Sequence, residues 1–128
     1  MILLDKVCVI TGAAGGIGAA LARRFSQEGA RGIVVADKQS KLIKQIATEV
    51  GGEAFIGDVT SETDILKLIK QAEDQYGEID IFCSNAGIIH LGSEQASNNE
   101  WQYCWDLHLM SHVYAARYLA PKMATRGD

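Results

Sequence analysis

The chain has 128 residues, of which 48% are hydrophobic and 22% are charged, so its length and composition fit one soluble globular domain. Its net charge of −4 and its dispersed basic residues argue against a nucleic-acid partner, and no apolar run reaches the roughly 18 residues of a membrane span. Cys8, Cys83 and Cys104 are spaced too widely for a disulfide framework or a zinc site, so we expect buried thiols, no metal and a cytoplasmic location.

The first part of the chain alternates between short apolar runs and helical patterns. We expect a strand over residues 6–11, a helix that ends near Gly29, a strand over residues 32–37 and a helix over residues 40–50. The first of these helices is defined by apolar residues at every fourth position, which are Ile17, Leu21 and Phe25.

The middle of the chain continues this alternation. A strand is expected over residues 54–58, and Ser61 with Asp64 forms a capping pair at the start of the next helix, which ends before Gly77. The apolar face of that helix consists of Ile65, Leu68, Ile69 and Ala72. A fourth strand is expected over residues 79–85.

A long helix fills the C-terminal part of the chain. Ser97 and Glu100 form a capping box at its start. Its apolar positions are Trp101, Trp105, Leu109 and Leu119. The alternation of strands and helices predicts right-handed βαβ units, and therefore an α/β domain over residues 1–128 with a parallel sheet.

The stretch TGAAGGIG, residues 11–18, lies where the first strand meets the first helix. Glycines let the backbone approach a pyrophosphate closely, and the free N–H groups at a helix start offset its charge. Asp37 follows Gly18 by 19 residues at the end of the second strand, as expected of a carboxylate that binds an adenosine ribose. These features predict a Rossmann-like, doubly wound sheet of order 3-2-1-4, with helices on both faces and a dinucleotide at the strand ends.

Asp37 also bears on which dinucleotide is bound. A 2′-phosphate placed about 4 Å from its charge would be repelled by roughly 4 kcal/mol at an effective dielectric near 20. We therefore expect NAD, with NADP less favoured, although Lys38 would offset part of this repulsion.

The glycine spacing in this turn, Thr-Gly-x-x-x-Gly-Ile-Gly, resembles that of the short-chain dehydrogenase/reductase family. The resemblance implies that the cofactor binds at Thr11, Gly12, Gly16, Ile17 and Gly18. Two further motifs resemble that family. In the first, GDVT, Asp58 and Val59 would bind the adenine. In the second, SNAG, Ser84 stands where the family has asparagine. Its remaining residues, Asn85, Ala86 and Gly87, would stabilise the sheet and line the ribose of the cofactor.

Two features depart from the family pattern. His108 stands where the long helix usually carries an asparagine, whose main-chain carbonyl supports a proton relay; a helix histidine without catalytic function is the alternative. By resemblance, the catalytic serine, tyrosine and lysine lie beyond a fifth strand, in proteins about twice this length. We therefore expect the fold to be truncated after its last helix.

The stretch YLAPK, residues 118–122, imitates a catalytic tyrosine–lysine pair, because residues four apart share a helix face. By resemblance it lies one helix too early, and the nearest upstream serine, Ser111, lies on the same helix. We interpret Tyr118 and Lys122 as a helix surface or a subunit contact, and we expect Pro121 to kink the helix.

The leading hypothesis is the cofactor-binding half of an NAD-dependent oxidoreductase that acts on a small alcohol or carbonyl compound, inactive as 128 residues alone. The alternative is a non-catalytic nucleotide-binding module or pseudoenzyme. No nucleic acid or membrane is expected as a partner. As in the family, we expect the complete protein to form a dimer or tetramer, and the aromatic residues of the long helix fit either a subunit contact or the core.

Overall fold

The computed structural model describes residues 2–127, in which four strands form one parallel sheet. Its strands are β1 (Val7–Thr11), β2 (Gly32–Asp37), β3 (Glu53–Ile56) and β4 (Ile81–Cys83). They lie in the order β3-β2-β1-β4 with every pairing parallel. The predicted fold class and strand order are therefore confirmed, and β4 forms one edge of the sheet.

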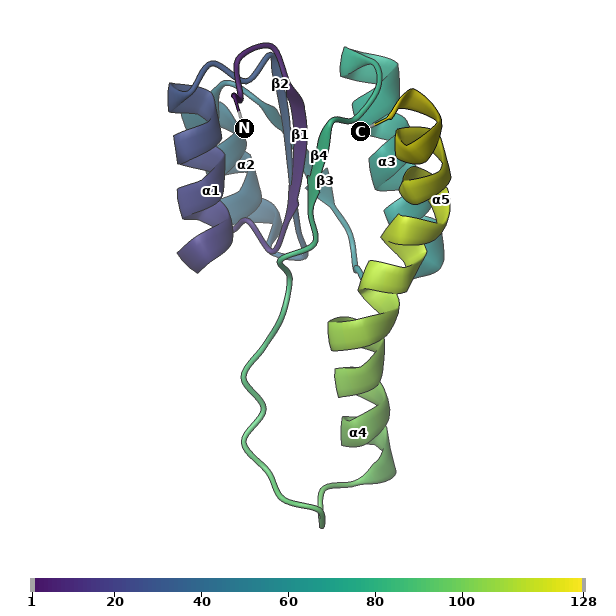
Figure 1. Ribbon diagram of the computed structural model, residues 1–128. Coiled ribbons are helices and arrows are strands. Elements are labelled where there is room, and N and C mark those ends of the chain that lie inside the picture. The colour runs from purple at the N-terminus through teal and green to yellow at the C-terminus, as the bar shows by residue number, and fades with distance from the viewer. Residues whose placement is uncertain (1, 128) are drawn as a thin grey trace.

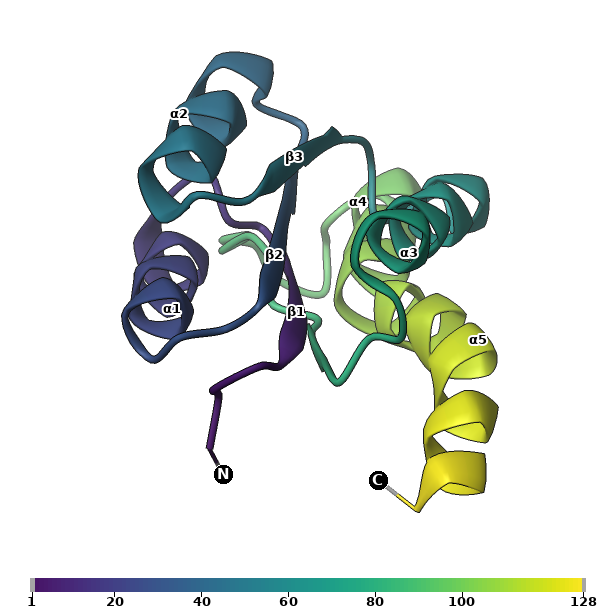
Figure 2. The ribbon, with the colours of Figure 1, turned by 90° about the horizontal axis from the view of Figure 1, so that it is seen from above.

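Helices cover both faces of this sheet (Figures 1 and 2). One face is covered by α1 (Gly16–Gln27) and α2 (Ser40–Val50), and the other by α3 (Glu62–Tyr76) and α5 (Ser111–Arg126). The segment after β4 and helix α4 (Asn98–Trp105) project beyond the carboxyl ends of the strands (Figure 1).

Strand β1 shows why this sheet is the centre of the domain. Its side chains alternate between two cores: Val7 and Val9 pack with α3 and α5, whereas Cys8 and Ile10 pack with α1 and α2. All four of these side chains are 0% exposed. A strand buried on both faces needs a continuous apolar run, which is the pattern of VCVIT.

Helix α1 packs on the sheet through small residues and through Leu21 and Phe25, two of the three residues of the predicted apolar pattern. Ile17 is 73% exposed, and the residues that α1 buries are Gly18, Ala19 and Ala22. The small residues let α1 lie close to the sheet, while Ile17 belongs to its first turn, at the end of the sheet. The period-four pattern therefore located the helix correctly, and of its three residues only Ile17 lies outside the core.

Two local predictions in the middle of the chain were only partly right. The Ser61 Oγ accepts the N–H of Asp64 at 3.3 Å, but the Asp64 carboxylate accepts the N–H of Asp58 at 2.9 Å instead of bonding back to Ser61. Strand β3 ends at Ile56, two residues before the predicted end; the Gly57 N–H still donates to the carbonyl of Asp37, and the chain turns at residues 59 and 60.

The predicted long helix is interrupted by a π-helical segment, η1 (Asp106–Met110), between α4 and α5. The capping box of Ser97 and Glu100 is present in both directions, and α5 continues through Pro121 to Arg126. Three of its predicted apolar positions are exposed, namely Trp101, Trp105 and Leu109, because α4 projects beyond the sheet that would cover them.

Candidate functional site

The glycine turn lies at the carboxyl end of β1, and two of its glycines are required by close backbone contacts. Gly12 has φ +66°, and a Cβ there would come within 2.7 Å of the Ala86 Cα. A Cβ on Gly18 would come within 2.4 Å of the Gly12 carbonyl oxygen. Gly16 and Ile17 are exposed in the first turn of α1, where no side chain caps the helix start. The first N–H groups of α1 therefore have no side-chain acceptor, which suits an anionic ligand.

Thr11 and Asn85 join the ends of β1 and β4. The Thr11 Oγ1 accepts the N–H groups of Asn85 and Ala86 at 3.0 and 3.1 Å, and it donates to the carbonyl of Cys83 at 3.4 Å. The side-chain amide of Asn85 donates to the carbonyls of Thr11 and Gly12 at 3.0 and 3.4 Å. These two side chains therefore hold the glycine turn against the segment that follows β4.

The Asp37 carboxylate is held in place by two backbone groups. It accepts the N–H of Ala14, in the glycine turn, at 3.2 Å and the N–H of Gln39 at 3.0 Å. Two carboxylate oxygens offer about four acceptor positions, so lone pairs remain for a ligand hydroxyl. Asp37 is thus oriented for hydrogen bonding at the end of β2.

A cavity of about 200 Å³ lies at these strand ends. It brings together six of the predicted residues, which are Gly12, Asp37, Asp58, Val59, Ala86 and Gly87. Sequence reasoning assigned no cavity position to the rest of its lining, which consists of Lys38, Gln39, Gly57, Ile88, Tyr103 and Leu107. The spacing of four between Tyr103 and Leu107 indicates one helix face, but only the fold shows that this face meets the strand ends.

The charges around this cavity are two carboxylates and one ammonium group. Asp58 accepts the N–H and the hydroxyl of Thr60 at 2.9 and 2.8 Å and lies 3.8 Å from the Lys38 Nζ. Partial burial raises the pKa of Asp58, but the hydrogen bonds from Thr60 and the charge of Lys38 outweigh it and leave this pKa below its ordinary value. Asp58 is therefore ionised at neutral pH.

His108 lies in η1, next to the segment that follows β4. A Cβ on Gly87 would come within 3.0 Å of its imidazole Cε1, so the ring lies against the Gly87 backbone. The ring is exposed, and π-helical segments are frequent at functional sites. His108 is thus adjacent to the candidate site, although it does not line the cavity.

The YLAPK pair faces helix α3, not the strand ends. The Tyr118 hydroxyl donates to Glu62 at 3.3 Å, and the Lys122 ammonium donates to both carboxylate oxygens of Glu73 at 2.7 and 2.8 Å. Both side chains therefore join α5 to α3 on one face of the sheet.

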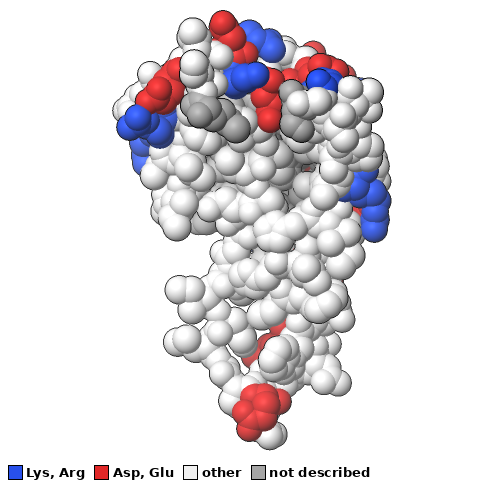
Figure 3. Space-filling view, in the orientation of Figure 1, with Lys and Arg blue, Asp and Glu red and all other residues white. Residues whose placement is uncertain are grey.

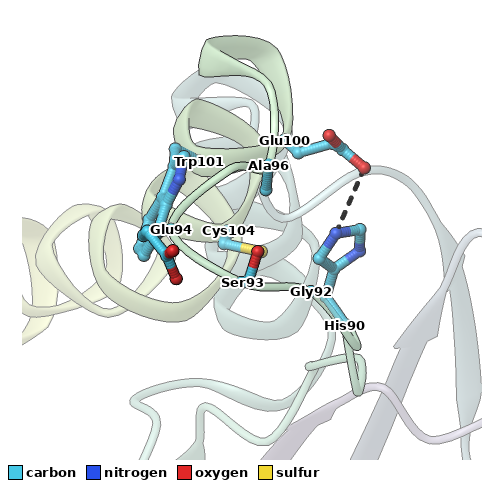
Figure 4. A pocket seen from close by; sticks show the side chains of 8 residues that line it. All are labelled: His90, Gly92, Ser93, Glu94, Ala96, Glu100, Trp101 and Cys104. Atoms are coloured by element: carbon cyan, nitrogen blue, oxygen red, sulfur yellow. Dashed lines mark ion pairs between the residues drawn. The ribbon is translucent and has the colours of Figure 1, made fainter.

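A larger cavity, of about 350 Å³, lies between α4 and the segment before it (Figure 4). Two of its polar side chains point toward each other, with the His90 Nε2 3.3 Å from a carboxylate oxygen of Glu100. Glu100 also accepts the N–H and hydroxyl of Ser97 at 2.7 and 2.8 Å in the capping box. Because these polar groups already have partners, we place the candidate site at the strand ends.

No helix among residues 2–127 is long and apolar enough to cross a membrane. Within the same residues, no group of three or more acidic, histidine or cysteine side chains is arranged to hold a metal ion.

A family model described as short chain dehydrogenase matches residues 6–128. The mitochondrial borneol dehydrogenase of Lavandula x intermedia is 41% identical, over 93% of this chain and 48% of its own. Zerumbone synthase of Zingiber zerumbet is 35% identical, over 96% of this chain and 50% of its own. The solved 3-ketoacyl-(acyl-carrier-protein) reductase of Brucella melitensis, complexed with NADH, is 29% identical and matches with a TM-score of 0.90, covering 98% of this chain and 54% of its own. The chain spans about half the length of the curated relatives it matches.

Proposed function

Because this chain belongs to the short-chain dehydrogenase family, a family of oxidoreductases, we propose that it forms the NAD-binding half of an enzyme acting on a small alcohol or carbonyl compound. When bound, NAD supplies the centre that accepts or donates hydride. The observation that carries this proposal is the Asp37 carboxylate, which is fixed by the N–H groups of Ala14 and Gln39 beside a cavity at the strand ends.

Different residues of this chain would bind different parts of the nucleotide. The glycine turn and the first turn of α1, including Gly16 and Ile17, would hold the pyrophosphate, since the first N–H groups of α1 have no side-chain acceptor. Asp37 would accept the hydroxyls of the adenosine ribose, and Asp58 and Val59 would contact the adenine. Ala86 and Gly87, which line the same cavity, would contact a ribose.

The preference for NAD over NADP follows from charge. A 2′-phosphate beside Asp37 would add a repulsion of roughly 4 kcal/mol at 4 Å and an effective dielectric near 20. Asp58 adds a second carboxylate to the same cavity. The cavity thus favours a ribose that carries a free 2′-hydroxyl.

By resemblance to the family, proton transfer would be carried out by a serine, a tyrosine and a lysine. These 128 residues do not include the positions at which the family has them. Tyr118 and Lys122 do not replace them in this proposal, since both bond to glutamates of α3. His108 would contribute its main-chain carbonyl to a proton relay, which its position beside Gly87 supports.

Substitution of Asp37 tests the ribose assignment. Asp37→Ala removes a charged acceptor, and we expect the Kd for NAD to rise at least about tenfold. The Kd for NADP should rise less, because the substitution also removes a repulsion. Isothermal titration calorimetry with both nucleotides measures this, with Asp74→Ala on α3 as a control. Equal losses for NAD and NADP would count against the role of Asp37.

The second candidate is a nucleotide-binding module without catalysis, favoured by the engagement of Tyr118 and Lys122 with α3. Intact mass separates the two candidates. A protein near 13.9 kDa in its natural source supports the module, and a mass near twice that value supports the enzyme.

We place the complete protein in the cytoplasm as a dimer or tetramer. The free thiols of Cys8, Cys83 and Cys104 suit a reducing compartment. Trp101 and Trp105 are 57% and 56% exposed on α4, and the projecting part of the molecule carries few charged side chains except at its tip (Figure 3). Exposed aromatic residues with little charge around them suit a contact between subunits. Sedimentation velocity tests this, and a monomer at every concentration would contradict it.

A further inference from the structure

The ammonium group of Lys38 is held across the mouth of the strand-end cavity by two partners from other elements. Its Nζ donates to the hydroxyl oxygen of Tyr103, on α4, at 3.4 Å and lies 5.7 Å from the centroid of the same ring. It also lies 3.8 Å from a carboxylate oxygen of Asp58. All three side chains line the cavity.

These contacts decide which carboxylate Lys38 neutralises. Within residues 2–127, Lys38 forms its ion pair with Asp58 and not with its neighbour Asp37. The hydrogen bond to Tyr103, the charge of Asp58 and, to a smaller extent, the charge of Asp37 raise the pKa of Lys38, so its charge is constant around neutral pH. Asp37 is instead bonded to two uncharged backbone groups.

We propose that Tyr103 determines nucleotide specificity by holding the Lys38 ammonium beside Asp58, where it offsets the negative charge of Asp37 at the ribose 2′ position less than it would if released. This inference rests on the proposed function and deepens it. A lysine directly after the ribose-binding carboxylate would otherwise be free to turn toward a 2′-phosphate. The position of Lys38 therefore depends on a residue of α4 that lies 65 positions away.

The expected effect is moderate because the contacts are partly exposed. The Lys38 side chain is 58% exposed, and exposed ion pairs and cation–π contacts are each weak. Release of Lys38 should therefore change the ratio of the Kd values for NADP and NAD by about fivefold.

Two substitutions of Tyr103 separate its hydroxyl from its ring. Tyr103→Leu removes both contacts, and we expect the ratio of the Kd for NADP to the Kd for NAD to fall about fivefold. Tyr103→Phe removes only the hydroxyl acceptor, so this ratio should fall about twofold. Trp105→Leu, on the same helix but outside the cavity, is the matched control and should leave the ratio unchanged. Isothermal titration calorimetry gives the Kd values, and thermal unfolding checks that each variant folds.

The double variant shows whether Tyr103 acts through Lys38. Lys38→Met combined with Tyr103→Leu should return the ratio to that of the parent protein, because the ammonium that would reach the 2′-phosphate is gone. Lys38→Met alone should change the ratio of the Kd for NADP to the Kd for NAD by no more than about twofold. Lys41→Met is the control for loss of a nearby lysine charge.

Three outcomes would overturn the inference. The first is an unchanged ratio in both Tyr103 variants, and the second is an equal fall with and without Lys38. The third is a parent protein that binds neither nucleotide, which would also remove the proposed function. In the first two outcomes NAD binding persists, so failure of the inference is distinguishable from failure of the function.

Discussion

Thr11 shows how one side chain serves the site without lining the cavity. Thr11 is 1% exposed, and its hydroxyl joins the ends of two strands through the N–H groups of Asn85 and Ala86. Its position in the motif predicts that Thr11 is a residue of the cofactor site. The structure adds a physical role, which is to fix the distance between the glycine turn and the segment after β4.

Thr11→Val should destabilise the protein by about 1–2 kcal/mol, because it keeps the side-chain shape but leaves two partly buried N–H groups without their acceptor. Urea unfolding followed by circular dichroism measures the loss. Thr48→Val, on the exposed face of α2, removes a hydroxyl bonded to the Lys44 carbonyl and is the matched control. We expect it to cost less than about 0.5 kcal/mol, and a similar loss in both variants would contradict the role given to Thr11.

At the scale of elements, α4 is the least supported helix of the described chain. It projects beyond the sheet and buries none of its residues, so its stability depends on local interactions (Figure 1). The capping box is the main one, with the Glu100 carboxylate accepting the N–H of Ser97 at 2.7 Å. Since α4 also carries Tyr103, fraying of this helix would loosen one wall of the proposed nucleotide cavity.

Ser97→Ala should therefore speed hydrogen exchange of the α4 amides by about fivefold while leaving those of α2 unchanged. Ser40→Ala is the control, since Ser40 begins α2 without serving as its cap. Equal exchange in α4 of the parent and the Ser97 variant would show that the cap is unimportant.

The same cap should weaken in acid. The hydrogen bonds from the Ser97 hydroxyl and N–H, with a further contribution from His90, hold the pKa of Glu100 below its ordinary value of 4.5. A carboxylate with a lowered pKa stabilises the fold above its ordinary pKa and loses this contribution as the pH falls through the lowered value. The effect of Ser97→Ala on α4 exchange should thus shrink below about pH 4.5.

For the whole molecule, the decisive feature is that Tyr118 and Lys122 of α5 face α3, while the candidate site lies at the strand ends. Lys122 forms a partly exposed ion pair with Glu73, and Tyr118 bonds to Glu62. Neither side chain lines the cavity at the strand ends. The pair therefore contributes to helix packing, and a hydride-transfer mechanism built on it has no support in the fold.

We expect the 128-residue chain to show no hydride transfer between NAD and alcohols, measured by absorbance of reduced nicotinamide. Tyr118→Phe and Lys122→Met should leave the Kd for NAD unchanged and lower the free energy of unfolding by less than about 1 kcal/mol each. Turnover by the parent chain that disappears in either variant would overturn this view and make YLAPK catalytic.

The fold class, the strand order and the family were all predicted correctly from the amino-acid sequence. These depend on local patterns: buried apolar runs, a glycine turn that only glycines can form, and a carboxylate at a known distance from it. The pattern also located α2 at its observed bounds and the capping box at Ser97. The roles of the site residues in binding NAD remain predictions.

Which faces are covered and which side chains meet became clear only from tertiary packing. The exposure of Ile17 and Trp101 and the π-helical interruption near His108 depend on what lies opposite each helix, which no local pattern encodes. The contact of Lys38 with Tyr103 joins residues 65 positions apart, and the engagement of Tyr118 and Lys122 with α3 depends on how two helices pack. The spacing of residues within a segment shows which side chains share a face, whereas the packing of distant segments decides which partners those side chains contact.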